Sequence, residues 1–207
     1  MIATLMAAAL MVGLGDRPPE FVAPQGIEDY SAWLTQAAID ADAGFFHEAC
    51  PDAAAQSIIN TPADADVAKD GVETPPHQGP IIKEVVRVAG CGRSSLQNLI
   101  VLHPATGGWI ARRMFPGSSL AGGRLQIEAL ASVVQTALTG PPALTCTAEE
   151  FQSSLRILDI SVVSLAKAKH AWTERWSIQV CGAERPMTVT FTTAADGKIA
   201  YTAKPAW

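Results

Sequence analysis

The sequence predicts an α+β protein built from two tandem copies of one unit, a helix followed by a three-stranded antiparallel β-meander. Three observations predict this fold: an internal repeat, four cysteines placed alike in both copies, and hydrophobic patterns that change from helical to strand periodicity. Each copy is expected to be stapled by a disulfide. The 207 residues suffice for two small domains that share an interface.

The internal repeat is an ungapped match between segments that lie ninety positions apart. Glu84–Gly92 and Glu174–Gly182 both place a glutamate seven residues before a Cys-Gly pair. At the same offset Thr106-Gly107 matches Asp196-Gly197, and both pairs contain the glycine that a hairpin turn favours. An ungapped match of this length predicts that one ancestral unit was duplicated.

Each copy should begin with a helix, over residues 28–40 in the first and 124–138 in the second. Apolar residues of the second helix recur at three- and four-residue steps and should form its buried stripe: Ile127, Leu130, Val134 and Leu138. The first helix carries a corresponding set: Tyr30, Trp33, Leu34 and Ala37. Gly140-Pro141-Pro142 should end the second helix, because proline cannot extend the hydrogen-bond ladder.

Strands are expected after each helix. Apolar and polar residues alternate over 176–180 and again over 187–192, which is the two-residue period of a half-buried strand. Asp196-Gly197 should then turn the chain into a third strand over 199–203. The first copy should have the same three strands, one ending at Cys91 and the others over 99–103 and 109–113.

The connection between helix and meander differs between the copies. Residues 60–80 of the first copy are rich in Pro, Asp, Gly and Thr, and they should form an exposed loop. Residues 155–169 of the second copy are more apolar, and they could form a helix or an additional strand.

The four cysteines, Cys50, Cys91, Cys146 and Cys181, include no C-x-x-C pair. Their wide spacing without clustered histidines argues against a zinc site, and in an oxidising compartment such cysteines normally pair. Four cysteines allow three connectivities. Duplication favours pairing within each copy, Cys50 with Cys91 and Cys146 with Cys181.

The N-terminal segment indicates export. Residues 1–15 carry no charge, and the run Ile2–Leu14 has the length of a signal-peptide core but is too short to span a bilayer. Cleavage after Gly15 would leave the two copies as residues 16–117 and 118–207. A buried N-terminal helix and an uncleaved anchor are the alternatives.

Candidate catalytic residues are few. Glu84 and Glu174 occupy matching places, and they could act as acid and base if the fold brings them together across a cleft. His103, at a strand end, is the other candidate. The alternative is that each glutamate is solvated or paired with an arginine where its strand enters the sheet. No motif for a metal, nucleotide or other cofactor is present, so none is predicted.

A binding surface is the other kind of site that the sequence suggests. Four aromatic residues could form an exposed platform for a protein partner, a glycan or an apolar ligand: Trp109, Trp172, Trp176 and Tyr201. The alternative is that they belong to the core. A net charge of −5 without a basic run argues against nucleic acid as a partner.

Together these features predict a non-catalytic binding or accessory module in the periplasm of a Gram-negative bacterium, with an unidentified ligand or envelope protein as its partner. The cleft between the two copies is the expected ligand site. A periplasmic hydrolase with acid/base carboxylates and an accessory subunit of a membrane-associated complex are the alternatives.

Overall fold

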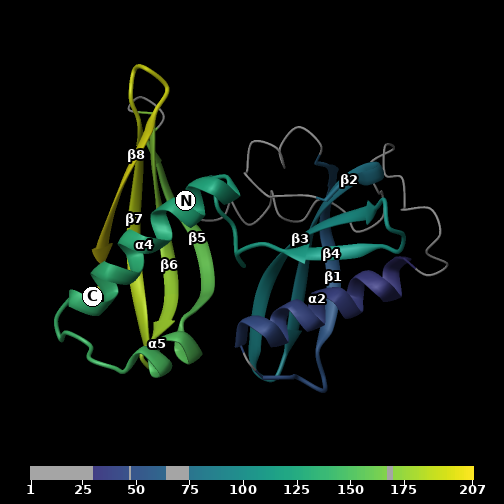
Figure 1. The fold of residues 1–207 in the computed structure, drawn as a ribbon. Coiled ribbons are helices and arrows are strands. Elements are labelled where there is room, and N and C mark those ends of the chain that lie inside the picture. Colours follow the sequence, from purple (N-terminus) through teal and green to yellow (C-terminus); the bar gives the residue numbers. More distant parts are fainter. Residues whose placement is uncertain (1–29, 47, 64–74, 167–169) are drawn as a thin grey trace, which may run out of the picture.

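The computed structural model describes residues 30–46, 48–63, 75–166 and 170–207. They form two halves that lie side by side, each an antiparallel four-stranded sheet with a long helix across one face (Figure 1). The α+β class is confirmed. The three-stranded meander is wrong, because each half has one further strand before it. The expected signal peptide, residues 1–15, lies outside the described residues.

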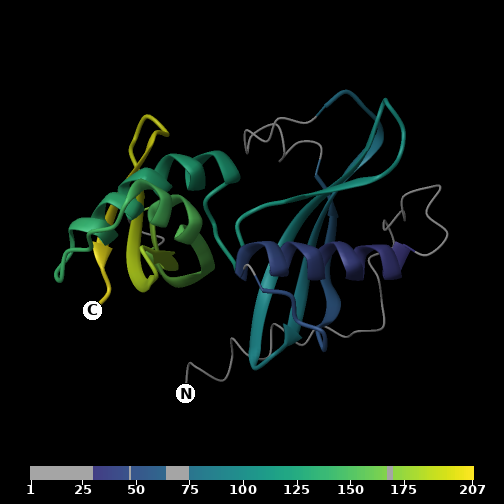
Figure 2. The ribbon, with the colours of Figure 1, turned by 60° about the horizontal axis from the view of Figure 1, so that its bottom comes forward.

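The first half is a simple meander in which consecutive strands are neighbours. Its elements are α2 (Tyr30–Phe46), β1 (Ala54–Pro62), β2 (His77–Gly90), β3 (Arg93–Pro104) and β4 (Ile110–Arg113). The helix α2 packs across the sheet (Figure 2), where Leu34 and Ala38 are buried with Val86 and Leu99 in one core. The helix runs to Phe46, beyond the predicted end at residue 40. Tyr30 and Leu34 of the predicted apolar set are buried, whereas Trp33 and Ala37 are only partly buried.

The second half repeats this order and adds a short helix. Its elements are α4 (Gly123–Thr139), α5 (Ala148–Ser154), β5 (Arg156–Ala166), β6 (Ala171–Val180), β7 (Ala183–Thr193) and β8 (Ile199–Pro205). Trp176 and Phe191 are fully buried, and they are the largest side chains of its core. The expected alternation is present, since Ile178 and Val180 are also buried on the same face of β6.

The helix α4 presents a different face to the sheet from the expected one. Ala129, Val133 and Ala137 are completely buried, whereas Ile127 is 60% exposed. The small alanines let the helix approach the sheet closely, so the bulky core residues come from the strands. The buried face of α4 is therefore rotated away from Ile127, which the periodicity alone had placed in the core.

The loop expected over residues 60–80 is shorter than predicted. The strand β1 continues to Pro62 and β2 already begins at His77, while residues 64–74 are not described. The sequence does not reveal β1, because this edge strand has no fully buried residue and begins with two alanines. Over residues 155–169 the strand is the correct alternative, since β5 forms there.

The repeated Cys-Gly pair is a two-residue hairpin turn in both halves. It connects β2 to β3 in the first half and β6 to β7 in the second. The φ angles are 48° and 72° at Cys91-Gly92, and 52° and 74° at Cys181-Gly182. Positive φ at both positions is the geometry of a type I′ turn, whose twist matches that of the strands. Glycine therefore follows each cysteine for a structural reason.

A disulfide joins each of these turns to the segment that follows the long helix of its half. The pairs are Cys50–Cys91 and Cys146–Cys181, separated by 41 and 35 residues. Loops of this length stabilise a fold by about 3–4 kcal/mol in the chain-entropy model. Two disulfides indicate an oxidising environment outside the cytoplasm. Among the described residues, no helix is both long and apolar enough to cross a membrane.

The linker between β4 and α4 is fixed to both sheets. The backbone N–H of Gly117 donates to the carbonyl of Leu96 at 2.7 Å, and that of Ser118 donates to Ile160 at 2.5 Å. A β-carbon on Gly117 would lie 2.6 Å from Asp159 Oδ1 and would clash with the Ile160 backbone. Partial burial raises the pKa of the Asp159 carboxyl, although a hydrogen bond with the Ile160 backbone opposes this. The linker is thus hydrogen-bonded to a strand of each half at their junction.

Replacing Gly117 by alanine should weaken this junction. Gly107→Ala is a matched control, because the φ angles are 92° and 94° but only Gly117 has other atoms close by. We expect Gly117→Ala to lower the free energy of unfolding by about 1–3 kcal/mol more than Gly107→Ala, which is the usual cost of overpacking. Urea denaturation measures both. Equal losses would show that the close contact at Gly117 contributes nothing.

Candidate functional site

Glu174 is fully buried in β6, where it binds the linker and two tryptophans. Its Oε1 accepts hydrogen bonds from the Ser119 hydroxyl at 2.7 Å, the Leu120 N–H at 2.9 Å and the Trp172 indole at 3.0 Å. Its Oε2 accepts one from the Trp176 indole at 2.9 Å. These donors compensate the carboxylate for its loss of water. They also attach the residues just before α4 to the second sheet.

Glu84 has the corresponding role in the first half. It is fully buried in β2 and accepts hydrogen bonds from the Tyr30 hydroxyl at 2.6 Å and the Ser57 hydroxyl at 2.9 Å. The side-chain amide of Asn60 donates to it as well. Tyr30 is the first residue of α2. In both halves, therefore, a buried glutamate holds the start of the long helix against the sheet.

The alternative from the sequence was that each glutamate is solvated, or paired with an arginine, where its strand enters the sheet, and neither glutamate is solvated. Both are fully buried, each in the interior of its own half. His103 lies elsewhere: across the ladder Glu84 is opposite Leu99, which is four residues from His103, or roughly 13 Å along a strand. Its ring packs edge-on against Trp109, with centroids 5.1 Å apart. The structure does not bring these three candidates into one acid–base site.

The four aromatic candidates do not form one platform either. Trp176 is fully buried, and Trp172 stacks on Phe191 with ring centroids 4.9 Å apart. The Tyr201 hydroxyl donates to the carbonyl of Glu128 on α4. Trp109 packs on the core of the other half. Three of the four therefore support the second core, as the alternative interpretation expects.

A pocket of about 250 Å³ lies at the junction of the halves. The first half contributes Lys83 from β2 and Asn98 from β3, and the second contributes Gln126 from α4. The linker forms another wall with Ser119 and its neighbours. This wall is held from both sides, because the Asn98 amide donates to two linker carbonyls at 2.8 Å and Glu174 binds Ser119. The pocket is therefore part of the fixed junction.

The surface exposed in the pocket is mainly polar, although Ile100, Met114, Phe115 and Leu120 also line it, and Lys83 is its one charged side chain. Gly122, which precedes α4, provides no side chain to cap the helix. Sequence reasoning missed this site, because its residues come from four segments that meet only in the fold. The expectation of a site between the copies was the one signal that pointed to it.

Comparisons with models of protein families, with curated proteins and with solved structures give no match.

Removing the charge of Glu174 should loosen the start of α4. Glu174→Gln replaces one carboxylate oxygen by an NH₂ group, which donates hydrogen bonds and cannot accept them. At least one of the groups that donate to Glu174 then has no acceptor. We expect unfolding to become easier by about 2–3 kcal/mol, the usual cost for a charged hydrogen-bonded group. Glu149→Gln is the control, because Glu149 is exposed on α5 and should change little. Chemical denaturation followed by tryptophan fluorescence provides the measurement, and equal stability of the two variants would contradict this role.

Proposed function

We propose that this chain is a non-catalytic binding module of the periplasm of a Gram-negative bacterium, and that it holds a small anionic ligand in the junction pocket. The observation that carries the proposal is a polar pocket between two fixed halves with Lys83 as its one charged side chain. Ligand sites commonly lie between domains, where the walls come from different parts of the chain.

The size and charge of the pocket narrow the ligand class. At about 250 Å³ it falls below the roughly 300 Å³ at which pockets for drug-sized ligands begin, so the ligand is small. Lys83 has no ion-pair partner among the described residues, and the pocket lining has no carboxylate to neutralise it. A carboxylate or phosphate group would complement this charge.

The duplication of one ancestral unit is part of the same proposal. Both halves order a helix before four antiparallel strands, and both place a buried glutamate seven residues before a cysteine in a hairpin turn. The short helix α5 has no counterpart among the described elements of the first half. Duplication accounts for a ligand pocket at the seam, since joining two similar units creates a surface that neither has alone.

A role as an accessory subunit is the second candidate. The edge strand β5 exposes Val163 by 62% and Leu165 by 52%, and it carries no charged residue over 160–166. An uncharged, apolar edge is a template for pairing with the strand of another protein.

Native mass spectrometry of the protein isolated from periplasmic extract tests the proposal. We expect the mass of residues 16–207 with two disulfides, together with a small noncovalent ligand. The ligand should be lost in Lys83→Ala and kept in Lys204→Ala, whose exposed lysine lies on β8 at the far edge of the second sheet. A bound protein instead of a small molecule would favour the second candidate.

A thermal-shift series tests the proposal even if the ligand is lost when the protein is isolated. It measures the melting temperature of the protein with added small anions. Acetate, succinate, inorganic phosphate and glycerol phosphate are the probes. At least one should raise the melting temperature of the wild type and of Lys204→Ala, but not that of Lys83→Ala. If no ligand copurifies and no probe acts through Lys83, the binding proposal is wrong.

A further inference from the structure

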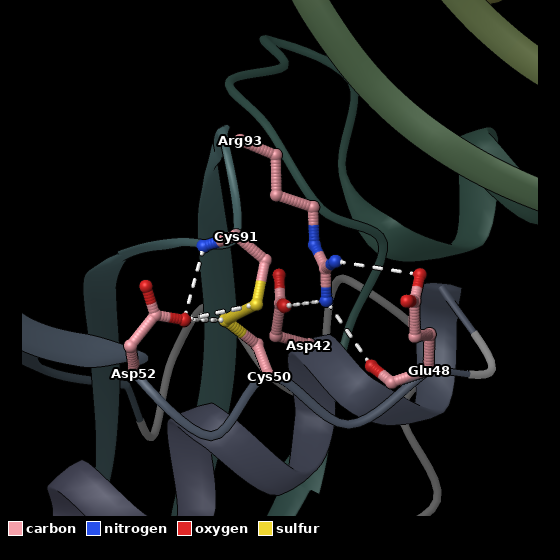
Figure 3. The surroundings of a disulfide bond; sticks show 6 residues. All are labelled: Asp42, Glu48, Cys50, Asp52, Cys91 and Arg93. Atoms are coloured by element: carbon pink, nitrogen blue, oxygen red, sulfur yellow. Dashed lines mark hydrogen bonds and ion pairs between the residues drawn. A yellow bond between two sulfur atoms is a disulfide. The ribbon is translucent and has the colours of Figure 1, made fainter.

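The two cysteines of the first disulfide and a neighbouring aspartate form a group of three potential metal ligands (Figure 3). Cys50, Asp52 and Cys91 each place one ligand atom within 4.8 Å of the other two. This is the one such group in the described part of the chain. It lies at the β2–β3 turn, away from the junction pocket. The sequence does not reveal it, because 39 residues separate Asp52 from Cys91.

The carboxylate of Asp52 lies directly against both sulfur atoms. Its Oδ1 is 2.8 Å from Cys50 Sγ and 2.9 Å from Cys91 Sγ. The backbone N–H of Cys91 donates to the same oxygen at 3.2 Å. A turn holds the carboxylate in this place, since the Ala53 N–H donates to the Cys50 carbonyl at 3.1 Å.

These contacts are unexpected for a disulfide alone. Its sulfur atoms carry no proton, so they cannot donate hydrogen bonds to the carboxylate, and all three atoms are rich in electron density. Among the described residues no cation pairs with Asp52; the nearby Arg93 binds Asp42 at 3.1 Å instead (Figure 3). Asp52 thus places an acidic oxygen beside both sulfur atoms, and none of the ion pairs of the described residues includes it.

The disulfide of the second half provides an internal comparison. Cys146 is followed by Thr147, which caps α5, and by Ala148 where the first half has Asp52. Cys181 occupies the same type of turn as Cys91. The carboxylate is therefore a property of one bridge and not a requirement of the turn.

We propose that Cys50, Asp52 and Cys91 form a zinc site when the first disulfide is reduced. A dithiol reductant converts the disulfide to two thiols and becomes a disulfide itself. Each thiol then releases one proton as it binds Zn²⁺, and the Asp52 carboxylate supplies the third ligand. Two thiolates and one carboxylate suit Zn²⁺, which accepts sulfur and oxygen ligands and leaves a fourth position for water.

The fold suits such an exchange. Cys91 is in an exposed turn and is accessible to a reductant, whereas Cys50 is buried. The Cα atoms of the pair are 5.9 Å apart, so with the same backbone the two thiols are close enough to bind one ion. Reoxidation by a small-molecule disulfide, which takes up two electrons and two protons and becomes two thiols, would in turn release Zn²⁺, because the re-formed Cys50–Cys91 disulfide cannot supply thiolates.

The test is zinc binding by the full chain after reduction with a phosphine, measured in competition with a chromophoric chelator. We expect one Zn²⁺ per reduced chain and none per oxidised chain. Asp52→Asn keeps an acceptor for the Cys91 N–H but removes the charge. It should weaken zinc binding by at least the 10–100-fold that loss of an outer ligand contact costs, while leaving the stability of the oxidised protein unchanged.

Cysteine variants separate this site from the other bridge. Cys146→Ser with Cys181→Ser should still bind one Zn²⁺ on reduction, and Cys50→Ser with Cys91→Ser should bind none. Should reduction unfold the chain, Zn²⁺ must restore the folded circular dichroism signal in the wild type but not in the variant without Cys50 and Cys91. The absence of zinc binding or restored folding, or an unchanged affinity in Asp52→Asn, would overturn the proposal.

Discussion

The structure depends on a buried carboxylate that holds the start of the long helix against the sheet in each half. Glu84 binds Tyr30 at the start of α2, and Glu174 binds Ser119 and Leu120 just before α4. A buried charge without donors would destabilise the fold strongly, so each glutamate requires its donors to be in place. The position of the helix start and the burial of the glutamate thus depend on each other.

The disulfide acts where the strand that carries the glutamate ends. Seven residues after each glutamate, a cysteine with positive φ begins a type I′ turn and connects it to the segment after the helix. The glutamate therefore fixes the strand to the start of the helix by hydrogen bonds. The disulfide fixes the end of the same strand to the segment that follows the helix. This explains why the glutamate and the Cys-Gly pair recur together at a constant distance. A small core benefits from both constraints.

Much of this could be predicted from the sequence, because helices, alternating strands and Cys-Gly turns leave local patterns. The strand β1 could not be predicted, because it lies at an edge of the sheet and buries no residue completely. The role of the glutamates could not be predicted either, because their donors come from distant segments and a charged residue is normally exposed. The buried stripe of α4 was misplaced at Ile127 for a related reason: the strands, not the helix, supply the large core residues. The junction pocket and the Asp52 cluster exist only after folding.

A double-mutant cycle between Tyr30→Phe and Glu84→Gln tests the central role of the carboxylate most directly. The two residues are 54 apart in sequence and meet in one hydrogen bond of 2.6 Å. If this contact holds α2 in place, the free energies of unfolding should show a coupling of about 1–3 kcal/mol. Losses that add within about 0.5 kcal/mol would show that the glutamate does not anchor the helix.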